Sequence, residues 1–234
     1  MYVSHVVLDF EMNPVCGESE DARADLCEEI IEIGAVKLNS AGQAIDSFSC
    51  MIRPQYSPEI LTVITNLTGI CTEDVSCAET FDAAVGKFSR WIGEEKTRIY
   101  SWSDTDLMQF ERECRYKNVE FPSNMKKWTD LQAVYPRIMR LSKRHEKVAL
   151  HIAAKENGIV FDEKKAHRAL YDAERTAELL TQILSGEYKK RIEKMKSVMR
   201  SEVVPMTSSM DSASGGKLAQ LLQLLQAEEA AEQE

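Results

Sequence analysis

Pairs of acidic residues at the ends of apolar segments are the side chains in this sequence best suited to do chemistry. Asp9 and Glu11 follow the apolar run VVL, and Asp104 and Asp106 follow the segment IYSW. Residues i and i+2 of a strand point to the same face, so Asp9 and Glu11 would project together. Two neighbouring carboxylates repel each other unless one is protonated or a cation lies between them. This pattern favours a site for a hard divalent cation such as Mg²⁺ or Mn²⁺.

A histidine and another aspartate lie close together further along the chain. The segment HRALYDAE contains His167 and, five residues later, Asp172. Five residues of a regular helix turn through roughly 500°, so two side chains at this spacing cannot face one point. We therefore expect His167 on the loop before a helix and Asp172 in the first turns of that helix. Histidine, with a reference pKa of about 6.5, can take a proton from water at neutral pH.

Each of these motifs also has a simpler interpretation when it is taken alone. Asp-x-Glu triplets are common in solvated turns, and a single histidine is most often a polar loop residue. The apolar segments before the acids favour a functional interpretation, because the ends of strands in α/β sheets are preferred ligand sites.

Hydrophobic periodicity predicts strands in the first half of the chain and helices in the second. The expected strands cover residues 3–9, 28–38, 42–54 and 97–106, with the first three in a meander. The expected helices cover residues 57–70, 78–93, 104–118, 128–138 (with a break near Pro136), 146–159 and 166–186. Residues 1–186 are therefore predicted to form an α/β domain in which helices cover a central sheet.

Residues 187–234 differ in composition from this domain. They comprise a basic stretch that can form a helix (187–202), a small polar linker (205–216) and a Leu-rich segment (217–234). The last segment is either a marginal, frayed helix or a helix that docks on a partner or on its own domain.

Length and composition exclude several classes of protein. The chain has 234 residues, 44% of them hydrophobic, which is enough for a globular core. No segment approaches the ~18 consecutive apolar residues of a membrane span, and the N-terminal residues do not have the pattern of a secretory signal. Six scattered cysteines without a CxxC pair argue against a disulfide framework and a zinc site. We expect reduced thiols and a cytoplasmic location.

The overall charge does not by itself indicate a protein that binds nucleic acid. The net charge is -9 and the pI is about 5.1. Basic residues are nevertheless concentrated in residues 125–128, 137–147 and 189–196. These stretches are either ordinary solvated helix faces or contacts for backbone phosphates.

Three motifs, in this order and spacing, resemble a known family. LDFEMN, YSWSDTD and HRALYDAERTA are similar to the three exonuclease motifs of the DEDDh superfamily. The resemblance is closest to the branch that includes the KapD-type sporulation inhibitors and the Eri-1-like RNA exonucleases. EIIEIGAVKLNSAGQAIDSFSCMIRP and LTGICTEDV support it. It covers about residues 3–185 and does not extend to the tail beyond Gly186.

The resemblance implies an RNase H-like exonuclease fold with a mixed central β-sheet flanked by α-helices. It also implies 3′→5′ hydrolysis of nucleic acid to nucleoside 5′-monophosphates with two Mg²⁺ or Mn²⁺ ions per site. By motif position, the metal ligands are Asp9, Glu11, Asp106 and Asp172, and the general base is His167. Asp106 is preferred to Asp104 because the family's acid stands four residues after the tryptophan.

The family binds the terminal nucleotide of its substrate beside the first motif. The candidate contacts in this chain are Phe10, Met12, Leu67 and Trp102. Core packing is the alternative, especially for Phe10, which points away from Asp9. The expected partner is nucleic acid with a free single-stranded 3′ end, RNA rather than DNA, and no membrane. Residues 217–234 offer a segment for a protein partner.

Two other functions remain compatible with the sequence. The chain could be a binding or regulatory protein with an exonuclease fold, like the sporulation inhibitors, or an accessory subunit that acts through its C-terminal tail. The presence of all five expected residue types favours the enzyme. A binding protein would tolerate the loss of Asp9 and Glu11, whereas an enzyme would not.

Overall fold

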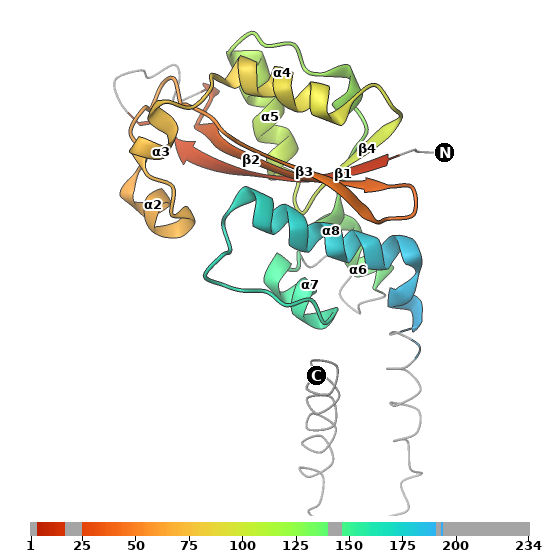
Figure 1. Ribbon diagram of the computed structural model, residues 1–234. Helices are drawn as coiled ribbons and strands as arrows, with labels where there is room; N and C mark the ends of the chain where they lie inside the picture. The colour runs from red at the N-terminus through yellow and green to blue at the C-terminus, as the bar shows by residue number, and fades with distance from the viewer. Residues whose placement is uncertain (1–3, 17–24, 140–146, 191–192, 194–234) are drawn as a thin grey trace, which may run out of the picture. The chain divides into compact units, whose positions relative to one another are not determined.

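A mixed sheet of five strands lies at the centre of the computed structural model (Figure 1). In the order β3-β2-β1-β4-β5, it contains β1 (Ser4–Pro14), β2 (Glu28–Asn39), β3 (Ala44–Met51), β4 (Thr97–Ser101) and β5 (Trp128–Asp130). β1 pairs with β2 and β2 with β3 in antiparallel fashion, whereas β1, β4 and β5 are parallel. The predicted mixed sheet is confirmed. The short β5 was not predicted, because its 3 residues are too few to show a period.

Helices cover both faces of this sheet. One face carries α4 (Phe81–Ile92) and α5 (Thr105–Tyr116), and the other carries α6 (Leu131–Ile138), α7 (Leu150–Glu156) and α8 (Ala169–Ser185) (Figure 1). The shorter helices are α2 (Thr62–Thr68), α3 (Thr72–Ser76) and the 3₁₀ turn η1 (Ser123–Met125). Among the described residues, no helix is long and apolar enough to cross a membrane.

The structure describes residues 4–16, 25–139, 147–190 and 193. These residues belong to one unit, residues 1–193. The predicted linker, the Leu-rich segment 217–234 and most of the basic tail lie outside the described residues, as do residues 140–146. The domain boundary predicted at residue 186 therefore stays a prediction.

The alternation of side chains along β1 decides which helical layer its acids face. Val6 and Leu8 pack in the core on the side of α4 and α5. Val7 packs in the core on the side of α8. Asp9 and Glu11 are two and four residues beyond Val7, so they face the α8 side of the sheet.

β1 extends further than the sequence predicts. The expected strand ended at Asp9, but the observed strand continues to Pro14. Asp9 pairs with Gly34 of β2, and Glu11 pairs with Glu32. Both acids are therefore held by ladder pairing within the strand, which fixes their direction more firmly than a position in a loop would.

The helix predicted from residue 57 begins only at Thr62. The backbone N–H groups of Gln55, Tyr56 and Ser57 donate to the buried carboxylate of Glu29 at 2.7, 2.8 and 2.9 Å. A side chain of β2 therefore holds residues 55–57 in the segment that precedes α2.

Two predicted helix ends are confirmed, and one predicted break is wrong. Gly69 and Gly186 follow α2 and α8 with φ angles of 75° and 76°, the left-handed conformation that glycine adopts without strain. Pro136, expected to break its helix, lies inside α6.

Candidate active site

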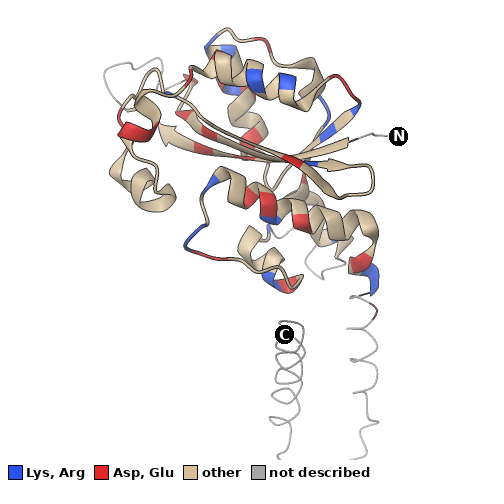
Figure 2. Cartoon of the chain, in the orientation of Figure 1, with Lys and Arg blue, Asp and Glu red and all other residues tan. Residues whose placement is uncertain are grey.

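Three separate parts of the chain bring the predicted acids together. β1 carries Asp9 and Glu11, the first turn of α5 carries Asp106, and the first turn of α8 carries Asp172. The backbone N–H of Phe10 donates to Oδ1 of Asp106 at 3.2 Å, which ties the start of α5 to β1. Figure 2 shows acidic segments on the central strands, between the two helical layers.

The two acids that follow β4 have different surroundings. Asp104 precedes α5, and its half-exposed carboxylate pairs with Nζ of Lys147 at 3.2 Å. Asp106 is 5% exposed and also accepts a hydrogen bond from Oγ of Ser103 at 3.4 Å. The structure places Asp106, and not Asp104, beside Asp9, and the choice of Asp106 as a metal ligand stays a prediction.

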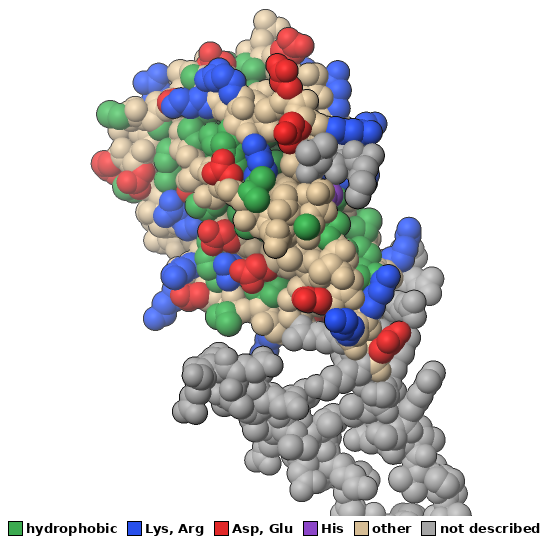
Figure 3. All heavy atoms as spheres, turned by 45° about the vertical axis from the view of Figure 1, so that its right-hand side comes forward, with side chains coloured by type: hydrophobic (Ala, Val, Ile, Leu, Met, Phe, Trp, Pro, Cys, Tyr) green, Lys and Arg blue, Asp and Glu red, His purple; other side chains and the backbone are tan. Residues whose placement is uncertain are grey.

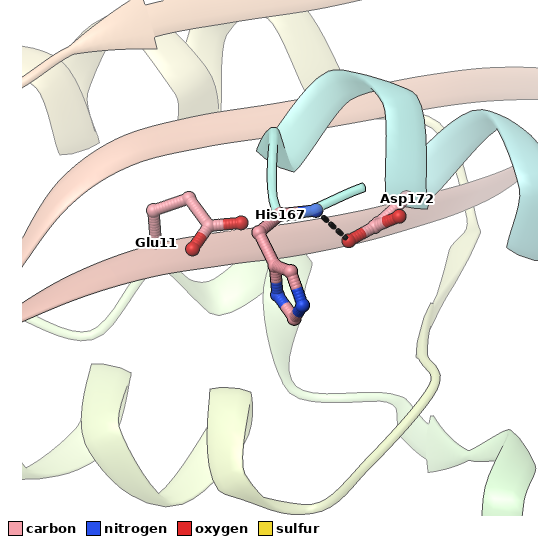
Figure 4. A group of neighbouring side chains, drawn as sticks. All are labelled: Glu11, His167 and Asp172. Carbon is pink, nitrogen blue, oxygen red and sulfur yellow. Dashed lines mark hydrogen bonds between the residues drawn. The ribbon is translucent and has the colours of Figure 1, made fainter. Parts of the chain in front are cut away.

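His167 lies on the loop before α8, as its spacing from Asp172 predicts. Its backbone has a left-handed φ of 61°, and α8 begins at Ala169. The backbone N–H of His167 donates to Oδ2 of Asp172 at 2.9 Å (Figure 4). One potential ligand atom from each of Glu11, His167 and Asp172 lies within 4.8 Å of the other two. The exposed imidazole and two buried carboxylates thus form one group.

The start of α8 approaches β2 closely at Gly34, the partner of Asp9 in the sheet. A Cβ atom at this position would lie 2.0 Å from the backbone nitrogen of Leu170 and 2.1 Å from the carbonyl carbon of Ala169. Only glycine leaves room for this contact. The absence of a side chain in β2 therefore brings the first turn of α8, which carries Asp172, next to the acids of β1.

Burial raises the pKa values of all four carboxyl groups, and repulsion by other members of the cluster adds to it for Asp9 and Glu11. Burial, then the charges of Asp106 and Glu11, hold the pKa of Asp9 well above its usual range. Burial, then the charge of Asp172, raise the pKa of Glu11 to about 8. Burial raises the pKa of Asp106 to about 7. It also raises the pKa of Asp172, against the hydrogen bond from His167. The cluster therefore retains protons at neutral pH unless a cation replaces them.

The donor atoms of the cluster fit a divalent metal ion. Oδ1 of Asp172 is buried and has no hydrogen-bond partner among the described residues, so it is available as a ligand. Carboxylate oxygens are the ligands that hard cations prefer. A bound cation would also remove the repulsion that raises the pKa values of these acids.

Comparison with known families identifies the kind of protein that carries this site. The family RNase_T, described as Exonuclease, matches residues 6–180, well over half of the chain. The chain belongs to this exonuclease family. The matched range includes every residue of the acidic cluster, from β1 to α8.

Relatives of this RNase_T exonuclease include proteins named as exoribonucleases. "ERI1 exoribonuclease 2" of Danio rerio is 29% identical over 202 residues, which cover 77% of this chain and 35% of the relative. "3'-5' exoribonuclease 1" of Rattus norvegicus is 26% identical over 194 residues, which cover 80% of this chain and 54% of the relative. The chain thus spans from about a third to about half of the length of these relatives.

A solved structure shows the same fold as this RNase_T exonuclease. The nuclease domain of 3'hExo, a DEDDh family member bound to rAMP, gives a TM-score of 0.69 at 23% identity. The match covers 79% of this chain and 93% of that chain. The RNase H-like fold expected from the motifs is confirmed.

The four predicted substrate contacts lie in different environments. Phe10 and Trp102 are 5% and 7% exposed and lie in the two cores. Their burial favours packing roles for these side chains over the substrate contact that the resemblance implies. Met12 is partly buried against the core. Leu67 of α2 is 49% exposed and is open to a ligand.

Sequence reasoning missed two residues beside the cluster, Glu32 and Arg168. Glu32 lies opposite Glu11 and is 1% exposed. Its carboxylate accepts hydrogen bonds from the Arg168 guanidinium and from the backbone of Ala169. A signal was present in the sequence, because an acid in the apolar run EIIEIGAV needs a partner once the strand is buried.

Proposed function

We propose that this chain is a 3′→5′ exonuclease that hydrolyses single-stranded nucleic acid from a free 3′ end to nucleoside 5′-monophosphates. The observation that carries the proposal is the convergence of Glu11, His167 and Asp172 within 4.8 Å, beside Asp9 and Asp106. Membership of the exonuclease family supports it. The preference for RNA over DNA rests on relatives that are named as exoribonucleases.

Four carboxylates would hold two divalent metal ions, Mg²⁺ or Mn²⁺, in the proposed site. The ligands are Asp9, Glu11, Asp106 and Asp172. When bound, such a pair of ions supplies the positive charge that activates a water molecule and stabilises the leaving 3′ oxygen. The carboxylates would carry roughly four negative charges, which matches two dications.

His167 would act as the general base. Its exposed imidazole lies on the loop beside Glu11 and Asp172, where it can accept a proton from the attacking water. The hydrogen bond from its backbone to Asp172 couples the position of the base to that of a metal ligand. Leu67 would contact the terminal base from α2, with Met12 beside the acids of β1.

The face of the molecule in Figure 3 carries basic and acidic side chains interspersed, without one continuous basic surface. The cytoplasmic location expected from the cysteines stays a prediction.

Digestion of labelled oligonucleotides tests the proposal. Single-stranded RNA and DNA of one sequence, labelled at the 3′ or the 5′ end, are incubated with Mg²⁺, Mn²⁺ or EDTA. The variant Asp106→Asn is compared with the control variant Asp104→Asn. Asp104 is a nearby acid that lies outside the cluster and pairs with Lys147. We expect stepwise shortening of RNA from the 3′ end, lost in EDTA. We expect a loss of at least about 100-fold in Asp106→Asn and a change below about 3-fold in Asp104→Asn.

Two outcomes would contradict the proposed enzyme. The first is a folded wild-type protein that shortens no oligonucleotide with either metal ion. The second is an Asp106→Asn variant as active as Asp104→Asn. Either result would favour the binding or regulatory function, for which residues 217–234 are the segment to test next.

A further inference from the structure

Glu32 is a buried carboxylate that the proposed chemistry does not use. It lies on β2 directly opposite Glu11 and is 1% exposed. Its negative charge contributes to the raised pKa values of the neighbouring acids Asp9, Glu11 and Asp172. A carboxylate this deeply buried is expected to have partners that compensate its lost hydration.

Among the described residues, the hydrogen bonds to the Glu32 carboxylate come from Arg168 and Ala169, where the His167 loop enters α8. Oε2 of Glu32 accepts from Nε of Arg168 at 3.2 Å and from the backbone nitrogen of Ala169 at 3.0 Å. Oε1 accepts from Nη2 of Arg168 at 2.9 Å. One side chain of β2 therefore binds both the residue after His167 and the first residue of α8.

This loop needs such an anchor because its backbone is strained. His167 has φ 61°, a left-handed conformation that strains a non-glycine residue unless its surroundings hold it. Arg168 is extended, with φ −121° and ψ 120°, and the chain then turns directly into α8. The paired hydrogen bonds from Arg168 fix the residue between the strained histidine and the helix.

We propose that Glu32 and Arg168 are positioning residues that hold the His167 loop and the first turn of α8 against β1. This inference rests on the proposed function, since it concerns the geometry of the same site. The pair sets where His167 and Asp172 lie relative to Glu11. It also turns the charge of Glu32 toward Arg168, so that this acid does not act as a fifth ligand.

The chemistry of the pair requires arginine specifically. A guanidinium offers two parallel N–H groups that match a carboxylate, whereas a lysine ammonium supplies charge without this fork. Arg168→Lys therefore separates charge from geometry. Arg175, which lies in α8 and pairs with Glu178 at 2.8 Å, provides the control Arg175→Lys.

The test measures metal binding and loop protection as well as catalysis. The full-length variants are Glu32→Gln, Arg168→Met, Arg168→Lys, the double variant Glu32→Gln/Arg168→Met, and Arg175→Lys. The measurements are Mn²⁺ affinity by calorimetry, hydrogen exchange of the His167 amide in the metal-free protein, kcat and KM on single-stranded RNA, and thermal stability.

We expect Glu32→Gln, Arg168→Met and Arg168→Lys to lower kcat and Mn²⁺ affinity roughly 10–100-fold, the usual effect of losing a residue that orients metal ligands. KM should change less than about 3-fold, and the His167 amide should exchange faster. The double variant should regain the thermal stability that Arg168→Met loses, because no unpaired buried charge remains, but it should not regain kcat. Arg175→Lys should behave like the wild type.

The inference would be overturned if Mn²⁺ affinity and exchange of the His167 amide stayed within about twofold of the wild type in all Glu32 and Arg168 variants. Recovery of kcat together with stability in the double variant would also overturn it, since the pair would then be structural only. Failure of the wild type to degrade RNA is a separate result that contradicts the proposed function. Metal affinity and exchange would then still decide the role of the pair.

Discussion

Glu11 illustrates how the site depends on protonation at the scale of a single residue. Its pKa in the folded protein is about 8, compared with its usual 4.5, and that of Asp106 is about 7, compared with 3.8. At a pH between the usual and the folded pKa of each acid, the folded protein therefore binds more protons than the unfolded chain. Stability contributed by the protonated acids is present at low pH and is lost as pH rises through the folded pKa values.

We predict that the free energy of unfolding of the metal-free protein falls as the pH rises from about 4.5 to about 8. Mg²⁺ or Mn²⁺ should restore stability most strongly at the upper end of this range, where the ligands release their protons to the metal. Thermal unfolding in EDTA and in excess metal ion, recorded across this range, measures both effects. A metal-free stability that rises toward pH 8 would contradict the prediction.

Neutralising Glu11 should have opposite effects on stability and activity. We predict that Glu11→Gln raises the stability of the metal-free protein at pH 8 by on the order of 1 kcal/mol, because it removes a buried charge from a repulsive cluster. The same change should abolish exonuclease activity, because a ligand is lost. Urea unfolding in EDTA and the oligonucleotide assay measure the two effects. Glu59→Gln, at an exposed position, should change neither.

Elements, rather than single side chains, bring the cluster together, and the close contact of β2 with α8 is the clearest example. We predict that Gly34→Ala displaces the start of α8, since the new Cβ would lie 2.0 Å from a backbone nitrogen. Stability and activity should both fall, with activity reduced at least about 10-fold through Asp172. Chemical denaturation and the oligonucleotide assay measure these losses.

Gly86 offers the matched control for this substitution. It lies inside α4, where an added Cβ would meet only the end of the Arg90 side chain at 3.4 Å. Gly86→Ala should stabilise the protein by roughly 0.5–1 kcal/mol, because alanine favours a helix interior. Equal effects of the two substitutions would show that Gly34 is not a point of close approach.

Asp106 lies in the first turn of α5. The C-terminal end of the same helix is joined to β2 by a buried triad of charged side chains. Nζ of Lys117 lies 2.7 Å from both Glu29 and Glu113, and all three side chains are at most 5% exposed. We predict that Lys117→Met destabilises the protein by about 3–5 kcal/mol, because two buried carboxylates lose their cation. Urea unfolding measures the change.

Lys147 supplies the control for the triad. Its side chain is 62% exposed and pairs with Asp104 at 3.2 Å. Lys147→Met should cost about 0–1 kcal/mol, the usual contribution of a surface ion pair. A loss in Lys117→Met no larger than this would mean that the triad does not anchor α5.

The elements that could be predicted from the sequence are those whose signal is local. The position of His167 before a helix and of Asp172 inside it followed from helix geometry alone. The extension of β1 to Pro14 could not be predicted, because it depends on pairing with β2 rather than on the composition of β1. The link between Glu32 and Arg168 joins residues 136 positions apart, and no local pattern reports such a contact.

At the scale of the whole molecule, the acidic composition and the proposed substrate are compatible. The formal net charge is -9, a count that treats every carboxyl group of the buried cluster as ionised. Two divalent cations would offset roughly four of these negative charges at the point where a phosphate must approach. Bulk charge is therefore a poor guide to substrate for a protein whose acids are metal ligands.

The alternation of side chains along β1 also makes the site depend on the correct register of β1 against β2. A slip of one residue against β2 would exchange Asp9 and Glu11 with Leu8 and Phe10, placing both acids in the dry layer beneath α4 and α5. A misaligned molecule would lose both β1 carboxylates together, although Asp106, His167 and Asp172 lie on other elements. For the wild-type protein, loss of specific activity caused by such a slip would measure the fraction of misaligned molecules.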